Sequence, residues 1–269
     1  MINGFKQDSA PGKIKTIKAS RMGSKISVIV PTLNEEDNLS NLLDSLEKQT
    51  LKDYEIIVID GGSTDKTVNL AKNYNSRVII EEGLPEFPSR NVGAKMAEGK
   101  ILLFTSADVV FPSELLAKID QNFRDQKLLA LTGPDWPDEL LLAKIEYCVY
   151  NLLRLMFSNF PKPTKRFSTS TNFLAVRKTA FEQTGSFLSE INADGILGKR
   201  LSEIGKVKFS KNTPVMISSR RFSKMGFLNF TVHYLYVLEN FFPFLSRTSF
   251  LKLLKNKSKS THGNIHLKT

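Results

Sequence analysis

Short apolar segments and amphipathic segments alternate through the first hundred residues of the chain. The apolar segments are continuous runs of aliphatic and aromatic residues, which are typical of strands buried on both faces of a sheet. They are ISVIV (26–30), EIIVID (55–60), RVII (77–80) and ILLFTS (101–106). Such strands, when helices separate them, predict right-handed crossovers and a parallel sheet.

Three helices are predicted between these strands. The first carries leucines at positions 39, 42, 43 and 46 on one face, and Asn34 with Asp37 predicts a capping box at its start. The second helix follows the turn GGSTD, and the third stops at Gly99.

The second half of the chain is less regular. We expect a proline-rich loop, an apolar helix and a basic loop, then a strand, two helices that stop at glycines and two short strands. In order, these are 133–139, 140–157, 161–170, 172–176, a helix to Gly185, a helix to Gly205, 206–210 and 213–219. The tail from Arg220 is aromatic and then basic.

Length and charge narrow the classes of protein and partner. With 269 residues and 41% hydrophobic content, the chain can form one large α/β domain or two small ones. Lys and Arg number 38 against 27 for Asp and Glu, a net charge of +11 that indicates nucleic acid, nucleotide phosphates or an acidic membrane surface as partner. The single cysteine, Cys148, excludes an internal disulfide and favours the cytosol. We expect it to be a small buried hydrophobe.

The two ends of the chain are polar or basic. Residues 1–24 lack the apolar core of a secretory signal, so we expect a disordered basic arm. Met22, just before the first strand, is an alternative start. The longest charge-free apolar run, 225–238, is too short and too polar to span a bilayer unaided.

Three polar residues follow the carboxyl ends of predicted strands: Asn34, Asp60 and Asp108. Ligands of open α/β sheets bind beyond these ends, so we expect the three residues to converge on one crevice. For Asn34 a turn or cap role is an equal alternative. For Asp108, which lies between apolar residues with no helix before Pro112, a cap is less natural.

Four segments together resemble a known family. ISVIVPTLNEEDNL and EIIVIDGGSTDKT resemble its nucleotide-binding segments, and SRNVGAKMAEGKILLFTSADVVFP resembles the segment that ends in its Asp-x-Asp metal motif. NFLAVRKTAFEQTGSF with INADGILGKRL resembles its acceptor and catalytic-base segment. The family is the family 2 inverting nucleotide-sugar glycosyltransferases. The resemblance implies the GT-A fold, a Rossmann-like three-layer α/β/α arrangement with a mostly parallel central sheet.

The resemblance also implies a chemistry. Displacing a nucleoside diphosphate from a sugar leaves negative charge on two phosphates, which calls for a divalent cation and cationic side chains. Asp108 matches the metal ligand, for Mg²⁺ or Mn²⁺. Asp194 matches the catalytic base that removes the proton of an acceptor hydroxyl.

The donor-binding residues follow from the same resemblance. Asp60 is expected to accept a hydrogen bond from a ring N–H of the base, near the backbone of Thr32 and Leu33 and the side chain of Glu35. Arg90 is expected at a helix start, paired with the diphosphate, with a solvated helix residue as the alternative.

Several motifs depart from the family pattern. Ser106 replaces the first carboxylate of Asp-x-Asp, Ala193 precedes Asp194 where an acid is usual, and the Gln-x-x-Arg-Trp motif of processive synthases is missing, which favours a single addition. In place of that motif, Arg220 and Arg221 follow a predicted strand. We expect them to supply charge to the leaving diphosphate, with an exposed basic strand end as the alternative.

Two segments, 139–157 and 222–254, are helical by period, rich in Leu, Phe and Tyr, and bordered by Lys and Arg. They predict peripheral contact with an anionic membrane and a lipid acceptor, such as a polyprenyl phosphate or glycolipid. For 139–157, core packing or a homodimer interface is an equal alternative. Nucleic-acid binding ranks third, because basic residues gather at the two ends and no binding motif is present.

We therefore expect a disordered arm (1–24), a GT-A glycosyltransferase domain (25–221) and an amphipathic, basic helical tail (222–269). The expected compartment is the cytoplasm, at the inner face of the cell membrane. The expected function is inverting transfer of one sugar from a nucleoside-diphosphate sugar to a hydroxyl or phosphate acceptor that is linked to a lipid. Two alternatives stay open. These are a catalytically silent relative that binds lipid or a partner, and a sugar nucleotidyltransferase, which the loop PTLNEEDN disfavours because it lacks glycines and basic residues.

Overall fold

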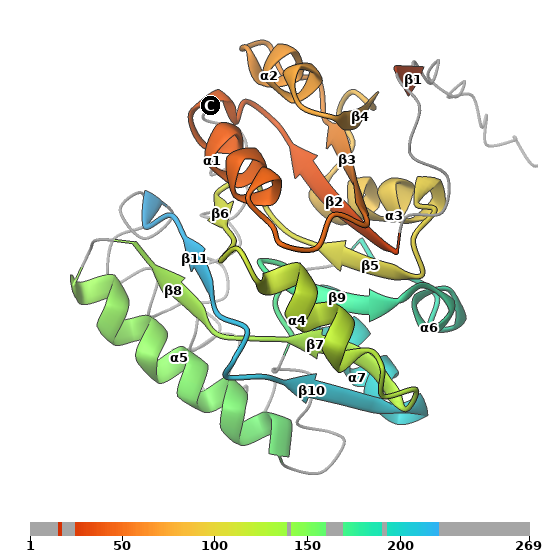
Figure 1. Ribbon diagram of the computed structural model, residues 1–269, viewed down its shortest axis with the longest axis vertical. Helices are drawn as coiled ribbons and strands as arrows, with labels where there is room; N and C mark the ends of the chain where they lie inside the picture. Colours follow the sequence, from red (N-terminus) through yellow and green to blue (C-terminus); the bar gives the residue numbers. More distant parts are fainter. Residues whose placement is uncertain (1–15, 18–24, 139–140, 160–168, 190–192, 221–269) are drawn as a thin grey trace, which may run out of the picture.

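A long sheet forms the centre of the computed structural model, which describes residues 16–17, 25–138, 141–159, 169–189 and 193–220 (Figure 1). Within these residues the sheet has eight strands in the order β1-β4-β3-β2-β5-β9-β7-β10. In chain order they are β1 (Thr16–Ile17), β2 (Ile26–Thr32), β3 (Tyr54–Asp60), β4 (Ser76–Ile80), β5 (Ile101–Phe104), β7 (Leu128–Thr132), β9 (Leu174–Arg177) and β10 (Lys206–Phe209).

The four strands predicted from apolar runs pair as expected. β2 is parallel to both β3 and β5, with Val28 opposite Ile56 and Leu103, and β3 is parallel to β4. The second half of the sheet breaks this pattern, because β9 runs antiparallel to β5 and β7. The prediction of a mostly parallel α/β sheet is confirmed. β7, which was not predicted, lies between β9 and β10.

Helices cover both faces of the sheet (Figure 1). They are α1 (Glu36–Glu47), α2 (Thr67–Asn73), α3 (Glu86–Met96), α4 (Leu115–Asn122), α5 (Leu141–Asn159), α6 (Lys178–Gln183) and α7 (Ala193–Ile204). Alternate residues of β2 serve different cores: Val28 and Val30 pack with residues of α1 and α4, and Ile29 packs with residues of α3, α6 and α7. Since neighbouring side chains of a strand point to opposite faces, two cores on one sheet give the predicted three layers.

A small second sheet joins distant parts of the chain. In the described residues it consists of β6 (Val109–Val110), β11 (Val215–Ile217) and β8 (Asp135–Pro137), with β11 in the middle. β11 is antiparallel to β6 and parallel to β8. It therefore carries residues 218–220 to the place where β5 ends.

Helix α5 confirms the apolar helix predicted at 140–157, but many of its apolar residues face outward and two polar residues face inward. Six apolar residues on it are exposed by 45–70%: Leu141, Leu142, Ile145, Val149, Leu152 and Met156. Its buried residues include Asn151 and Arg154. Cys148 is exposed, so the prediction of a buried cysteine is wrong. The pattern of apolar residues does not reveal which face of this helix turns inward, because the inward face is partly polar.

The predicted capping box at the first helix is also wrong. α1 begins at Glu36, its N-cap residue Glu35 makes no side-chain cap bond, and Asn34 has a φ of 51°. Groups of another loop cap α1 instead, and sequence spacing does not show this.

The ends of the chain are described only in small part. Of the predicted arm, Thr16–Ile17 pair with β4, and the rest of the arm and the tail 222–269 lie outside the described residues. No helix in the described part of the chain is long and apolar enough to cross a membrane.

Candidate active site

The loops after β2 and β3 cap each other at the carboxyl edge of the sheet. The backbone N–H of Thr64 donates to Asn34 Oδ1 at 2.9 Å. In return, the N–H of Glu36 donates to Asp65 Oδ2 at 3.1 Å, and the N–H of Glu35 donates to Thr67 Oγ1 at 2.8 Å. These bonds satisfy the free N–H groups at the start of α1 and hold both loops in one arrangement.

Asp60 lies at the end of β3 and is fully buried. Its carboxylate accepts hydrogen bonds from Thr32 Oγ1 at 2.9 Å, from Ser63 Oγ at 2.6 Å and N–H at 2.8 Å, and from Gly62 N–H at 3.1 Å. These four bonds organise the turn after β3. Recognition of a nucleotide base by Asp60 stays a prediction, as it does for Thr32 and for the 38% exposed Leu33.

Glu35 and Arg220, both predicted to bind the donor, form an ion pair with each other. Arg220 Nη2 lies 2.8 Å from Glu35 Oε1 and 3.0 Å from Oε2. The two residues are 185 positions apart in sequence and meet because β11 ends beside the loop after β2. Part of each side chain stays exposed, at 33% for Arg220 and 19% for Glu35. Arg221 lies outside the described residues.

Arg90 is in the second turn of α3, and its side chain is completely buried. The guanidinium donates to the carbonyl oxygen of Thr105 at 2.6 Å, to Glu86 Oε1 at 2.7 Å and to Ser106 Oγ at 3.2 Å. The alternative of a solvated helix residue is therefore wrong. Arg90 fixes the residues that follow β5, and its contact with a diphosphate stays a prediction.

Asp108 is half-buried, just before β6. Its backbone oxygen accepts a hydrogen bond from Ser218 N–H at 2.9 Å, and no group among the described residues is hydrogen-bonded to its carboxylate. No cluster of three or more potential metal ligands occurs in that part of the chain either. Since Mg²⁺ and Mn²⁺ bind through one or two carboxylates plus substrate phosphates and water, a lone carboxylate fits a cation that is held jointly with a diphosphate.

Asp194 lies in the first turn of α7, partly exposed. The N–H of Gly195 donates to its Oδ1 at 2.8 Å, and Thr169 Oγ1 donates to its backbone oxygen at 2.8 Å. Desolvation among the surrounding protein atoms raises the pKa of Asp194, and the negative charge of Glu86 raises it further. The Gly195 bond, and the charges of Arg154 and Arg90, act in the opposite direction.

A chain of contacts connects the predicted residues. Arg220 pairs with Glu35, and the N–H of Ser218, two residues before Arg220, bonds to the backbone oxygen of Asp108. On the other side, Arg90 bonds to Ser106 and acts electrostatically on Asp194. The loops that follow three neighbouring parallel strands are thus connected to one another, and the charge of Arg90, which holds the loop after β5, lowers the pKa of Asp194 on α7. This arrangement can present positive charge to an anion and a basic carboxylate to a hydroxyl group.

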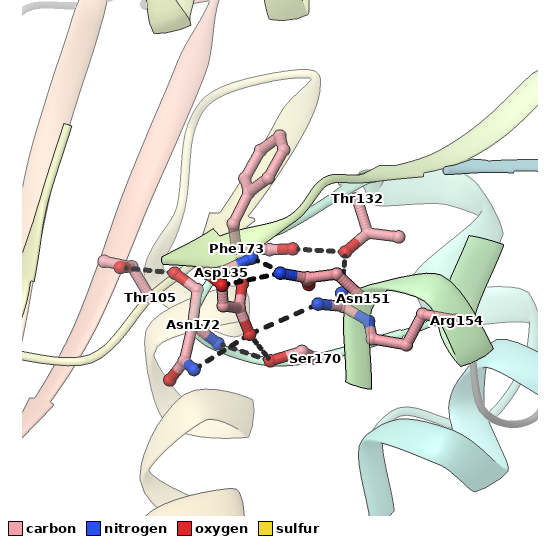
Figure 2. A network of polar contacts seen from close by, with 8 residues as sticks. All are labelled: Thr105, Thr132, Asp135, Asn151, Arg154, Ser170, Asn172 and Phe173. Atoms are coloured by element: carbon pink, nitrogen blue, oxygen red, sulfur yellow. Dashed lines mark hydrogen bonds and ion pairs between the residues drawn. The ribbon is translucent and has the colours of Figure 1, made fainter. Parts of the chain in front are cut away.

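Sequence reasoning missed the buried polar network between α5, β8 and the segment before β9. Asp135 and Arg154 form a buried ion pair at 3.2 Å, within a network that Figure 2 shows from close by. A signal for it exists in the sequence. Tyr147, Asn151 and Arg154 lie four and three positions apart, so the polar residues of α5 share one helical face.

Comparison with family models identifies the family of the chain. The model described as "Glycosyl transferase family 2" matches residues 27–185, more than half of the chain.

Curated proteins match over a shorter stretch. The chain is 36% identical over 122 residues to the poly(ribitol-phosphate) beta-N-acetylglucosaminyltransferase TarS of Staphylococcus aureus, covering 40% of the chain and 21% of TarS. It is 37% identical over 100 residues to a PGL/p-HBAD biosynthesis glycosyltransferase of Mycobacterium bovis, covering 35% of the chain and 39% of that protein. The chain thus spans about a fifth to two fifths of the length of these relatives.

Solved structures share the fold. The mannosyltransferase PcManGT from Pyrobaculum calidifontis, in complex with GDP-Man and Mn²⁺, aligns with a TM-score of 0.65 at 17% identity, over 90% of the chain and 72% of that protein. TarS 1-349 in complex with UDP-GlcNAc aligns with a TM-score of 0.57 at 20% identity, over 79% of the chain and 66% of TarS 1-349. At these identities the likeness concerns the fold, and it confirms the predicted GT-A architecture.

Proposed function

Since the chain belongs to glycosyl transferase family 2, we propose that it moves a single sugar, with inversion, from a nucleoside-diphosphate sugar to a hydroxyl or phosphate acceptor carried on a lipid. The donor class is supported by the two related structures that contain GDP-Man or UDP-GlcNAc. A single addition is supported by the lack of a Gln-x-x-Arg-Trp motif in the sequence. The observation that carries the proposal is the carboxyl edge of the sheet, where Arg90 holds Ser106, Ser218 bonds to the backbone of Asp108, and Arg220 pairs with Glu35.

Asp194 is the proposed catalytic base. It accepts the proton of the acceptor hydroxyl while the acceptor oxygen bonds to the anomeric carbon, and the bond to the diphosphate breaks with its electron pair on the phosphate oxygen. One displacement of this kind inverts the anomeric centre. A raised pKa suits this role, because a general base works best when its pKa approaches the operating pH.

The leaving diphosphate is proposed to meet positive charge from Arg220, with Arg221 as a further source. Asp108, beside Ser106, would hold Mg²⁺ or Mn²⁺ together with the diphosphate. When bound, the cation supplies positive charge to the leaving group. The base is expected near Thr32, Leu33, Glu35 and Asp60, and Arg90 is expected on the diphosphate side.

The acceptor is proposed to be lipid-linked because of the outer face of α5. We call the six exposed apolar residues of this helix the outer stripe: Leu141, Leu142, Ile145, Val149, Leu152 and Met156. An amphipathic helix that keeps its apolar face in water is typical of peripheral contact with a membrane. Peripheral contact with the anionic inner face of the cell membrane would bring a lipid acceptor to the enzyme.

Donor binding is tested by thermal unfolding with UDP-, GDP- and dTDP-sugars, each with and without Mn²⁺. A ligand at one hundred times its Kd stabilises by about 2.7 kcal/mol, which for a protein of this size is a rise of roughly 5–10 °C. Asp194→Asn should keep this shift and lose about 10²- to 10⁴-fold in sugar release. Glu203→Gln, on the exposed side of the same helix, is the control that should keep both. A protein that binds none of the donors would be a catalytically silent relative.

Membrane contact is tested by sedimentation with vesicles of phosphatidylglycerol and of phosphatidylcholine. The protein should bind the anionic vesicles, and Ile145→Asp with Leu152→Asp should weaken binding. Ile204→Asp serves as control, because Ile204 is also exposed, by 45%, but lies on α7. If the stripe instead forms a homodimer, light scattering without lipid would detect a dimer that the double variant abolishes.

A further inference from the structure

The inward face of α5 carries a buried cation, Arg154. Arg154 is 1% exposed and Asp135 is fully buried, and Arg154 Nη1 lies 3.2 Å from Asp135 Oδ2. Asn151, one turn earlier on α5, bonds to the backbone of Asp135 in both directions: it accepts from the N–H at 3.1 Å and donates to the carbonyl oxygen at 2.8 Å. The helix and β8 are thereby fixed to each other (Figure 2).

Further contacts hold both members of the ion pair in place. Ser170 Oγ and Asn172 Nδ2 donate to Asp135 Oδ2 at 3.0 and 3.1 Å, and Arg154 Nη2 donates to Thr132 Oγ1 at 2.8 Å. The Arg154 guanidinium also lies 5.1 Å from the ring centres of Tyr150 and Phe209. Removing two charges from water costs several kcal/mol for each, and the attraction between them often does no more than offset this cost. Stability alone therefore does not explain why the chain keeps this ion pair.

Asp194 shares the environment of this cation. Thr169, which bonds to the backbone of Asp194, is followed directly by Ser170, which bonds to Asp135. The charge of Arg154 lowers the pKa of Asp194, against the effect of burial. The pKa of Tyr150 is raised to about 12, mainly by burial. The charge of Arg154 opposes this rise, and the charges of Asp135 and Asp194 add to it. Hydrogen bonds of the neighbouring residues Thr169 and Ser170 thus connect the buried ion pair to the start of α7, where Asp194 lies.

We propose that Arg154, held by Asp135, is a positioning residue that keeps Asp194 ionised and oriented as the base of the reaction. This inference rests on the proposed function. Arg154 supplies a fixed positive charge that offsets the desolvation of Asp194, and Asp135 limits this effect because it pairs with the same cation. The other charged groups that act on Asp194 are Glu86 and Arg90 of α3, which oppose each other.

The test is the pH dependence of kcat/KM for donor hydrolysis by the full chain. Arg154→Met should move the acidic limb of the profile to higher pH. Because kcat/KM falls about tenfold per pH unit below this limb, the variant should lose activity at acidic pH and regain it as the pH rises. Asp135→Asn should move the limb in the opposite direction, to lower pH, because Arg154 then acts on Asp194 without a competing carboxylate. Arg154→Lys should keep the limb close to that of the unchanged protein, because it retains the charge.

Opposite movements of the limb distinguish this role from a structural one. If Arg154→Met and Asp135→Asn leave the limb in place, or move it in the same direction, the proposal is wrong even when both variants lose activity. A donor-induced rise in Tm shows that each variant is folded, and Asp135→Asn alone decides the proposal where Arg154→Met does not fold, because a limb that does not move to lower pH contradicts it. If Asp194→Asn retains full activity, the proposed base itself is wrong. Loss of activity in that variant, with an unchanged profile in the others, contradicts the role of Arg154 alone.

Discussion

Gly198 provides a sharp test of how α7 holds the site. It lies one turn after Asp194, and α7 packs there against Thr169. An ideal Cβ on Gly198 would lie 2.7 Å from Thr169 Cγ2 and 3.1 Å from its Cβ, and still closer to Oγ1. Real atoms do not approach this closely, so Gly198→Ala must displace the Thr169 side chain. That side chain donates the 2.8 Å hydrogen bond to the backbone oxygen of Asp194.

The expected cost follows from three terms. Forcing a methyl group into a packed contact costs about 1–3 kcal/mol, and losing the Thr169 hydrogen bond costs about 0.5–1.5 kcal/mol. Replacing glycine by alanine inside a helix returns about 1 kcal/mol. The net loss is then about 2 kcal/mol, which for a protein of this size lowers Tm by roughly 4–8 °C.

A double-mutant cycle isolates the contact. Thr169→Ala alone should cost about 1 kcal/mol, for the hydrogen bond. In that background Gly198→Ala should cost nothing or stabilise the protein, because both atoms nearest to the new methyl group are gone. Urea unfolding of the four proteins gives the coupling energy. A coupling below about 0.5 kcal/mol, which is the scatter expected for independent sites, would refute the reasoning.

Three further predictions concern the same edge of the sheet. Because folding raises the pKa of Asp194, this residue contributes its full stabilisation below the pKa that it has in the unfolded chain, and the contribution is lost as the pH rises through its pKa in the folded protein. Asp194→Asn should therefore raise Tm more at pH 7.5 than at pH 4, and a rise in Tm that does not depend on pH would contradict this. Arg220→Gln should decrease the donor-induced rise in Tm, since its guanidinium is proposed to meet the diphosphate; an unchanged rise would count against the proposal. Asn34→Ala should cost about 1 kcal/mol more than Asn34→Gly in urea unfolding, because a φ of 51° strains alanine but not glycine.

The stripe and the polar face of α5 show where sequence patterns reach their limit. Periodicity correctly predicts a helix at 140–157, because apolar residues recur at helical spacing over many turns. It does not decide which face is buried. Here Asn151 and Arg154 turn inward, since a carboxylate from β8 and hydroxyl groups from other segments satisfy them. The apolar residues that would usually form a core remain outside.

The sequence by itself determined the four parallel strands, the helices between them and the strand ends at which Asp60 and Asp108 lie. It did so because burial on both faces selects continuous apolar runs, and short-range spacing selects helices and turns. Only the tertiary structure decided that Asn34 caps a neighbouring loop and that Glu35 meets Arg220. The physical reason is that hydrogen bonds and charge pairs act over a few ångströms in space, while these partners are 30 to 185 residues apart in sequence.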